Sequence, residues 1–249
     1  MRMKQIIKVI IPARDEAASI ALVVEGFLAL RDESGAVLID QVIVSDNGSK
    51  DNTAALARQA GAHVVSEPIA GYGRACLTAM AELGVCDWVL FCDGDNAFET
   101  GQAIELLKAS KQADLVIGSR VLGRREAGAL TPPQIFGNHL AAFLISLFWG
   151  VQMTDLGPYR LIRKEALDYL RMQDEAFGWT VEMQIKAIQC GLVTHEVAVN
   201  TRCRLGYSKI SGTLKGTVGA AIGIFGMIAK LWWQEKKTRA NYQRANKDA

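Results

Sequence analysis

The chain has 249 residues, of which 50% are hydrophobic and 22% are charged. This composition excludes a disordered or fibrous protein and leaves enough apolar material for the core of one large domain or two small ones. The net charge of +2 is too balanced for a nucleic-acid-binding domain, but residues 200–249 hold ten basic and two acidic residues. We therefore expect the C-terminal part to meet an anionic partner, either ligand phosphates or a membrane surface.

The first half of the chain alternates short apolar runs with Ala- and Leu-rich stretches. Strands are expected at 6–11, 42–45, 63–65, 88–92 and 115–118, and helices at 17–30, 53–59, 73–83 and 100–110. Continuous apolar strands that alternate with helices indicate an α/β fold with a mostly parallel, twisted sheet covered by helices on both faces. Ligands of such sheets bind beyond the carboxyl ends of the strands, so the polar residues after each strand are the candidate site.

The second half has a different pattern. After an Arg-rich loop we expect an apolar helix at 134–149, helices at 164–170 and 180–190, a strand at 195–200, and a polar tail from Gln234 that is a frayed helix or disordered. Two uncharged stretches, 127–154 and 216–229, are interrupted or bracketed by polar residues, so neither is expected to span a membrane. The predicted division is a catalytic domain at 1–212 and an apolar and basic amphipathic helical segment at 213–249, which contacts a membrane surface or a second copy.

Asp93, Gly94 and Asp95 directly follow the apolar run at 88–92. By itself, Asp-x-Asp is more often a turn rich in Asp and Gly. Two carboxylates at the buried end of a strand are costly, however, unless a cation or a proton compensates their charge. A hard divalent cation shared with a diphosphate satisfies that requirement.

The segment that begins at Asp46 follows the preceding strand. Much of it fits a turn with Asp51 as a helix N-cap. Asp46 itself is left unexplained, and a carboxylate at that place can accept from the imide N–H of uracil or guanine.

Arg74 lies at the start of a helix, after Gly71 and Gly73. The pattern fails as a dinucleotide fingerprint because position 76 is Cys. Arg74 is still expected to contact a phosphate or a base, because helix N-termini favour anions.

The C-terminal region contains a cluster of cations and a stripe of glycines. Residues 202–212 hold three cations and no acid, which favours a loop that closes over an anion, although a solvated basic face is the usual explanation. Glycines at 212, 216, 219, 223 and 226 fall on one helical stripe. The stripe fits packing against the helix at 134–149 as well as it fits a lipid or dimer contact. Trp232 and Trp233, beside several lysines, favour a membrane interface.

In their order along the chain, these motifs resemble those of family 2 glycosyltransferases, and within them the dolichol- or polyprenyl-phosphate hexosyltransferases. The resemblance runs from about Ile6 to Gly226 and implies a GT-A fold, a nucleotide diphospho-sugar donor such as UDP-glucose or GDP-mannose, and Mg²⁺ or Mn²⁺ at Asp93 and Asp95. It also implies a lipid phosphate acceptor at the cytoplasmic face of a membrane. Two departures are Ala97 near the metal motif, where members often carry a polar residue, and Asn47 where they often carry a second acid. Expected donor-binding residues are Pro12, Ala13, Arg14, Glu16, Asp46, Asn47, Gly48, Ser49, Arg74, Asp93, Gly94 and Asp95.

For the reaction, we expect an inverting transfer to a polyprenyl phosphate. An ionised phosphate needs positioning more than a general base, and the expected acceptor-binding residues are Arg120, Arg202, Arg204, Ser208 and Lys209. If the acceptor were a hydroxyl, a carboxylate base would be required, and Asp155 and Glu182 are the candidates. A non-catalytic nucleotide-sugar binding module is a third alternative, which the intact Asp-x-Asp pair disfavours.

Overall fold

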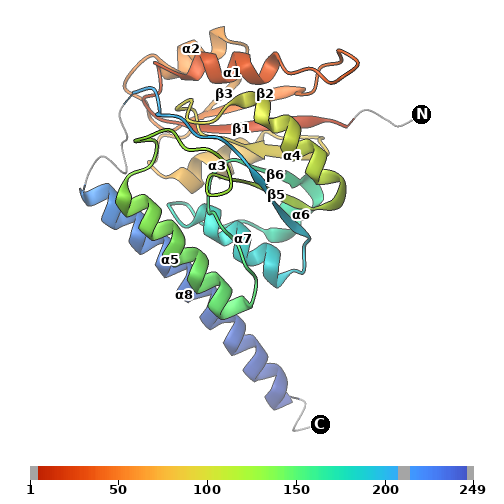
Figure 1. Ribbon diagram of the computed structural model, residues 1–249, viewed down its shortest axis with the longest axis vertical. Coiled ribbons are helices and arrows are strands. Elements are labelled where there is room, and N and C mark those ends of the chain that lie inside the picture. Colours follow the sequence, from red (N-terminus) through yellow and green to blue (C-terminus); the bar gives the residue numbers. More distant parts are fainter. Residues whose placement is uncertain (1–4, 207–213, 246–249) are drawn as a thin grey trace.

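The computed structural model describes residues 5–206 and 214–245, and within these residues the strands form one seven-stranded sheet (Figure 1). The strands are β1 (Ile7–Ala13), β2 (Gln41–Asp46), β3 (His63–Ser66), β4 (Trp88–Phe91), β5 (Leu115–Ser119), β6 (Arg160–Arg163) and β7 (Thr194–Ala198). Their order in the sheet is β3-β2-β1-β4-β6-β5-β7. All neighbouring strands are parallel except β6, which runs antiparallel to β4 and β5.

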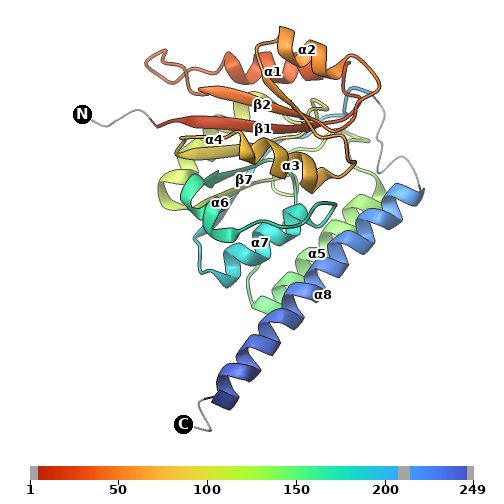
Figure 2. The same cartoon turned by 180° about the vertical axis from the view of Figure 1, so that it is seen from behind.

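Helices cover both faces of the sheet (Figures 1 and 2). They are α1 (Ile20–Leu28), α2 (Thr53–Gln59), α3 (Tyr72–Ala81), α4 (Ala103–Ala109), α5 (Pro132–Trp149), α6 (Lys164–Leu170), α7 (Trp179–Gln189) and α8 (Leu214–Ala245), with short 3-10 turns at Thr100–Gln102 and Ser110–Gln112. Alternate residues of β1 belong to different cores: Val9 and Ile11 lie with α1, and Ile10 lies on the other face. Burial on both faces explains why the strands are continuous apolar runs, and the mostly parallel α/β architecture is confirmed.

Strand β6 was not predicted from the sequence. It has only four residues, and the arginine at each end leaves only two consecutive apolar residues, too few for a recognisable strand pattern. These two residues, Leu161 and Ile162, are fully buried between β4 and β5. An antiparallel strand in a largely parallel sheet has no connecting-helix pattern that would reveal it.

Helices α5 and α8 lie side by side at one edge of the molecule (Figure 2). The ring of Phe148 stacks on Trp232 with centroids 4.9 Å apart, and Trp149 Nε1 donates to Glu235 Oε2 at 2.6 Å. Because Ile228 and Leu231 belong to the main core, the middle of α8 is packed onto the sheet domain. The helix then continues to Ala245, so of the two alternatives for the tail from Gln234, helix or disorder, the described residues show the helix.

The glycine stripe of α8 has an intramolecular use. A Cβ added at Gly223 would lie 3.1 Å from Cβ of Phe177, and one added at Gly219 would lie 3.7 Å from the Phe177 ring, so two of the glycines let α8 approach Phe177 closely. Gly212 lies outside the described residues, as do Ser208 and Lys209. Among the helices that the structure describes, none is both long and apolar enough to cross a membrane.

Candidate active site

A cavity of about 420 Å³ opens beyond the carboxyl ends of β1, β2 and β4. The residues that line it end or follow these strands, precede or begin α3, precede α7 or come from the C-terminal loop: Pro12, Ala13, Arg14, Glu16, Asn47, Ala70, Gly71, Tyr72, Ala75, Asp93, Gly94, Asp95, Ala176, Phe177 and Arg204. Eight of the residues expected to bind the donor therefore line one cavity. The expected residues Asp46, Gly48, Ser49 and Arg74 are outside this lining.

Asp93 and Asp95 lie just past the end of β4. Asp93 Oδ1 is buried and has no hydrogen-bond partner. Burial raises the pKa of Asp93 to about 7, assisted by the charge of Asp95 and opposed by Arg204. Asp95 is 5% exposed, and its Oδ2 lies 3.3 Å from Nη1 of Arg204. The pair therefore holds more negative charge than its protein partners neutralise.

This donor set fits a hard divalent cation. Among the described residues there is no group of three or more acidic, histidine or cysteine side chains that could hold a metal alone. Mg²⁺ and related ions commonly use one or two carboxylates and take the remaining ligands from water and substrate phosphates. The unpartnered oxygen of Asp93 and the neighbouring Asp95 match that arrangement.

Asn47 fixes one wall of the cavity. Its Nδ2 donates to the carbonyls of Glu67 at 3.0 Å and Ile69 at 2.7 Å, and its Oδ1 accepts from the N–H of Gly71 at 2.8 Å. The amide group is thus used by the segment 67–71. Asp46 turns toward its own loop, where Oδ1 accepts from the N–H of Ser49 at 3.2 Å.

Arg74 is directed away from the cavity. The N–H of Gly73 donates to the carbonyl of Ala176 at 3.1 Å, and the N–H of Arg74 donates to that of Glu175 at 3.0 Å. The Arg74 guanidinium also pairs with the Glu175 carboxylate. The start of α3 therefore binds the chain at 175–176 in place of an anion.

Glu182 supports the same loop from inside. It is 1% exposed, its carboxylate accepts from the N–H groups of Gln173 and Asp174, and it forms an ion pair with Lys186 at 2.7 Å. The loop that it holds carries Phe177 into the cavity wall.

Three expected acceptor-binding cations are bound within the protein. Arg120 Nε and Nη2 donate to Asp155 at 2.8 and 2.6 Å. Asp155 is fully buried, and although burial opposes its ionisation, the hydrogen bonds and charge of Arg120 hold its pKa below the usual value. Arg202 donates to the carbonyl oxygen and the side chain of Asn96 at 2.8 and 2.6 Å, while Arg204 pairs with Asp95 as described above.

Tyr72, Ala176 and Phe177 also line the cavity and were not predicted from the sequence. Tyr72 stands between two glycines that were recognised as a motif, so a close approach of the backbone could have drawn attention to its side chain. Ala176 and Phe177 depend on the packing of the 173–178 loop against α3, for which the sequence carries no signal.

Comparison with known proteins agrees with this architecture. The family model "Glycosyl transferase family 2" matches residues 8–171. The chain is 32% identical to Glycosyltransferase AglJ of Haloferax volcanii over 188 residues, which cover 75% of this chain and 59% of AglJ. It is 26% identical to the Undecaprenyl-phosphate mannosyltransferase of Micrococcus luteus over 240 residues, which cover 92% of this chain and 97% of that protein.

Solved structures share the fold. Mannosyl-3-phosphoglycerate synthase from Rubrobacter xylanophilus superposes with a TM-score of 0.73 at 20% identity, covering 94% of this chain and 75% of that one. Glucosyl-3-phosphoglycerate synthase from Mycobacterium tuberculosis, in complex with Mn²⁺, UDP and glucosyl-3-phosphoglycerate, gives 0.72 at 22% identity, covering 91% and 80%. The GT-A fold expected from the sequence is thereby confirmed.

Proposed function

The chain belongs to glycosyl transferase family 2, and we propose that this glycosyltransferase moves a hexose from a nucleotide diphospho-sugar to a polyprenyl phosphate, with inversion at the anomeric carbon. The observation that carries the proposal is the cavity at the strand ends, in which Asp93 and Asp95 lie beside Arg204. A diphosphate brings the negative oxygens that, together with two carboxylates, suit a divalent cation. The solved neighbour with Mn²⁺ and UDP supports the same kind of donor.

In the proposed step, an oxygen of the acceptor phosphate attacks the anomeric carbon while the bond from that carbon to the diphosphate oxygen breaks. The nucleoside diphosphate leaves with the electron pair. Mg²⁺ or Mn²⁺ held by Asp93 and Asp95 would neutralise charge on the departing diphosphate. Arg204 lies in the same wall and can supply a further positive charge.

The acceptor side has features that suit a lipid phosphate. A second cavity of about 220 Å³ lies between α5 and α8, and its lining includes Arg120 and apolar residues such as Ile224 and Phe225. This combination suits a phosphate followed by a prenyl chain. The name of the Micrococcus luteus relative, which this chain matches over nearly its whole length, also supports a polyprenyl phosphate acceptor.

Transfer to a hydroxyl acceptor has less support. It requires a carboxylate that can take the proton, and the two candidates are already engaged: Asp155 by Arg120 and Glu182 by Lys186 and two backbone N–H groups. Neither lines the donor cavity. A phosphate acceptor avoids the need for either residue to act as a base.

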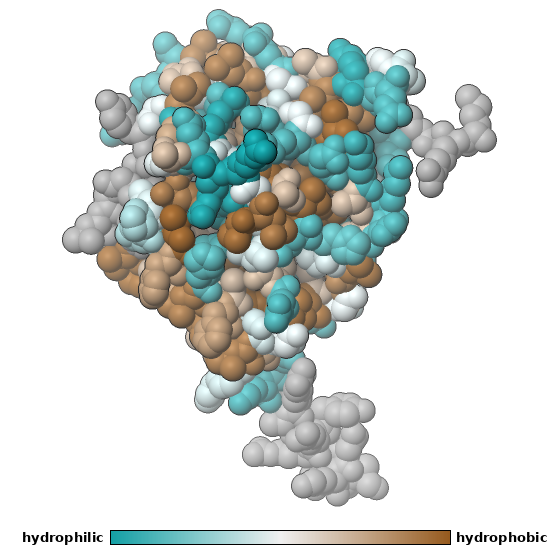
Figure 3. Space-filling model, in the orientation of Figure 1, coloured by the Kyte–Doolittle hydropathy of each residue, from teal (hydrophilic) through white to brown (hydrophobic). Residues whose placement is uncertain are grey.

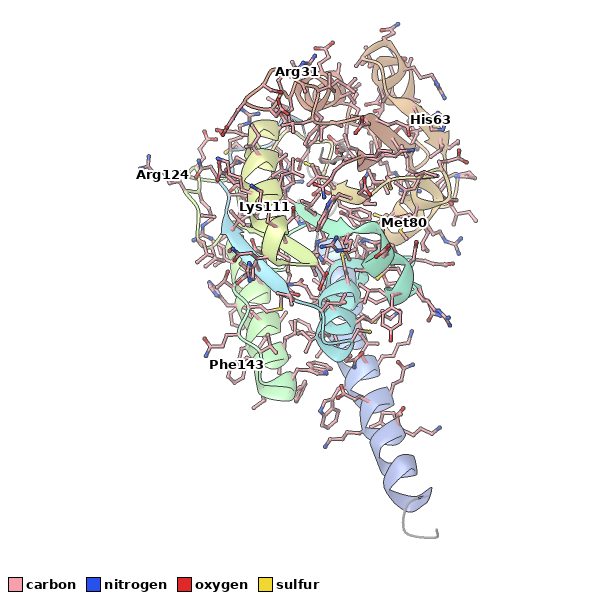
Figure 4. The ribbon with its side chains drawn as sticks, turned by 90° about the vertical axis from the view of Figure 1, so that its right-hand side faces the viewer. Arg31, His63, Met80, Lys111, Arg124 and Phe143 are labelled. Atoms are coloured by element: carbon pink, nitrogen blue, oxygen red, sulfur yellow. The ribbon has the colours of Figure 1, made fainter. Side chains whose placement is uncertain are left out.

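We also propose that α5 and α8 attach the protein peripherally to an anionic membrane, at its cytoplasmic face. Phe136, Phe143 and Leu147 are 60–69% exposed on one side of α5, where Phe143 projects outward (Figure 4). The apolar surface over these helices is visible in Figure 3. Exposed Lys230 and Lys237 on α8 provide positive charge beside it. A homodimer remains the second prediction for this segment.

The transfer proposal is tested with purified protein, a panel that includes UDP-glucose and GDP-mannose, and a short polyprenyl phosphate, with and without Mg²⁺ or Mn²⁺. We expect one donor to give a prenyl-phosphate sugar in a metal-dependent reaction, and no product with the matching prenol, which lacks the phosphate. Turnover of the prenol at a similar rate would overturn the choice of acceptor. Binding to liposomes that weakens at high salt tests the membrane contact separately.

A further inference from the structure

Phe177 lies at the boundary between the donor cavity and the second cavity. It is half-buried and, with Ala176, lines the donor cavity, while Thr180, three residues further along the chain, lines the second cavity. Helix α8 lines the second cavity with Ala220 and Ile224. One short segment before and at the start of α7 therefore forms a wall of both cavities.

The chemical order of the proposed donor determines which part of it meets Phe177. In a nucleotide diphospho-sugar, the diphosphate lies between the nucleoside and the hexose. With the diphosphate at Asp93 and Asp95, the hexose has to point toward the acceptor, for which the second cavity is proposed. Arg120 of that cavity follows β5, and β5 and β2 lie on opposite sides of β4 in the sheet. The nucleoside is therefore expected on the β2 side, near Asn47, and the hexose on the side of Phe177.

The segment that contains Phe177 is held against α8, which lies beside α7 (Figure 2). A Cβ added at Gly223 would lie 3.1 Å from Cβ of Phe177, and one added at Gly178 would lie 3.0 Å from Cβ of Met227. Gly223 and Met227 are four residues apart, so both lie on the same face of α8. On its other side, the segment is bound by the backbone N–H groups at the start of α3. The position of Phe177 therefore depends on how closely α8 approaches.

We propose that the ring of Phe177 contacts the transferred hexose, and that α8 sets the position of this ring through the close contact at Gly223. The C–H face of a pyranose can pack on an aromatic ring, and aromatic side chains are common in the walls of ligand pockets. This inference deepens the proposed function. It rests on the proposed donor and on the side from which the acceptor approaches, but not on the acceptor being a lipid phosphate.

The test compares the binding of a sugar nucleotide with the binding of the same nucleotide without its sugar. Isothermal titration in Mn²⁺ gives the dissociation constants of UDP-glucose or GDP-mannose, whichever the wild type binds, and of UDP or GDP. Phe177→Ala should raise the constant of the sugar nucleotide about tenfold, because the contact with the hexose is lost, and should change that of the nucleoside diphosphate less than about twofold. An equal rise of both constants would make Phe177 a nucleotide contact and overturn the proposal, as would no change in either.

Gly223→Val tests the role of α8, and Gly226→Val is the matched control on the same helix. A Cβ added at Gly226 would meet no atom of a neighbouring element within 4 Å. Gly223→Val should raise the constant of the sugar nucleotide about threefold to tenfold, since small displacements of a contact are costly, and Gly226→Val should leave it unchanged. In the Phe177→Ala background, Gly223→Val should cause no further rise, because no ring is left to move. If melting curves show that Gly223→Val does not fold, Gly223→Ala and Gly226→Ala provide the same comparison.

Two results would overturn the role of α8: equal effects of the substitutions at Gly223 and Gly226, or an effect of Gly223→Val that adds fully to that of Phe177→Ala. If the wild type transfers nothing to a polyprenyl phosphate while the binding results are as expected, the proposed acceptor fails and this inference stands. If transfer proceeds while Phe177→Ala leaves both constants unchanged, the proposed function stands and this inference fails.

Discussion

The proposed donor cavity and the proposed acceptor side of the molecule hold their charged residues in opposite ways. In the donor cavity, Asp93 keeps a buried oxygen without a partner. On the acceptor side, Arg120 is held at two points by Asp155, and Arg202 is held by Asn96. Charge left without a partner in the interior is costly and points to a ligand, whereas charge already paired can serve the structure alone.

Arg204 joins the two regions. It comes from the C-terminal loop, which the sequence assigns to the acceptor, yet it lines the donor cavity and pairs with Asp95. The N–H of Leu205 also donates to the carbonyl of Asp95 at 3.0 Å, so the loop is fixed to the metal motif by backbone as well as side chain.

The largest effect is expected from Asp93→Asn. The amide keeps the volume but removes the charge that a cation needs, so metal-dependent turnover should fall by at least about 100-fold, since metal ions supply several kcal/mol of charge stabilisation. The melting temperature should not fall, because a buried charge without a partner is removed. Turnover assays and thermal melts measure both. Asp168→Asn, at an exposed position of α6, is the control that should behave as the wild type. Full activity of Asp93→Asn at saturating Mn²⁺ would remove Asp93 from the metal site.

Arg204→Gln and Arg202→Gln test whether the C-terminal loop serves the acceptor. Arg204 lines the donor cavity, so we expect Arg204→Gln to raise the apparent donor constant about tenfold, the effect of losing one charge-assisted hydrogen bond, and to raise the acceptor constant as well where the loop serves the acceptor. Arg202→Gln should have a smaller effect, because its guanidinium is engaged by Asn96. Steady-state titration of acceptor and donor distinguishes the two. Equal effects of both substitutions would mean that Arg202 leaves Asn96 when the acceptor binds.

The location of the carboxylates at the edge of the sheet could be predicted from the sequence, because it depends only on their position directly after a strand. A parallel sheet brings its carboxyl ends to one edge, so Asp93 and Asn47 had to lie near each other once the strands were recognised. The continuous apolar runs of the strands likewise predicted that both faces of the sheet are buried under helices. Strand β6 was missed because its pattern is short and antiparallel, and because arginines flank it.

Pairing on the acceptor side could not be predicted in this way. Arg120 and Asp155 are 35 residues apart, and the sequence shows only that one is basic and the other acidic. Asp155 was therefore a candidate base, although its buried ion pair leaves it no such freedom in the structure. The contact depends on how the loop before β6 packs against the end of β5, which is a tertiary property.

The substitutions Asn47→Asp and Asn138→Asp remove the same kind of contact, a side-chain amide that donates to backbone carbonyls, from each of the two regions. Each asparagine Nδ2 donates to backbone carbonyls: Asn47 to Glu67 and Ile69, and Asn138 to Thr154 at 2.9 Å. A carboxylate would place an acceptor against those carbonyls, so each variant should lose about 1–3 kcal/mol of unfolding free energy in denaturant titrations. Only Asn47→Asp should also weaken UDP binding, because Asn47 holds the segment whose residues Ala70 and Gly71 line the cavity. Weaker UDP binding by both variants would contradict the separation of the two regions.

The smallest effect concerns pH and belongs to the donor cavity. The pKa of Asp93 is raised from 3.8 to about 7 in the folded protein, mainly by burial. The associated stability is therefore fully present below pH 3.8 and is lost as the pH rises through about 7.

A cation binds the ionised carboxylate, so it should offset that loss most above pH 7. We expect Mn²⁺ with UDP to raise the melting temperature by about 2–4 °C more at pH 8 than at pH 6, which corresponds to roughly 1 kcal/mol for a chain of this size. Thermal melts at the two pH values measure the difference, and Asp93→Asn controls for the titration of UDP itself. Equal increments at both pH values in the wild type would show that ionisation of Asp93 does not limit metal binding, and the charge imbalance that distinguishes the donor cavity would then need another ligand.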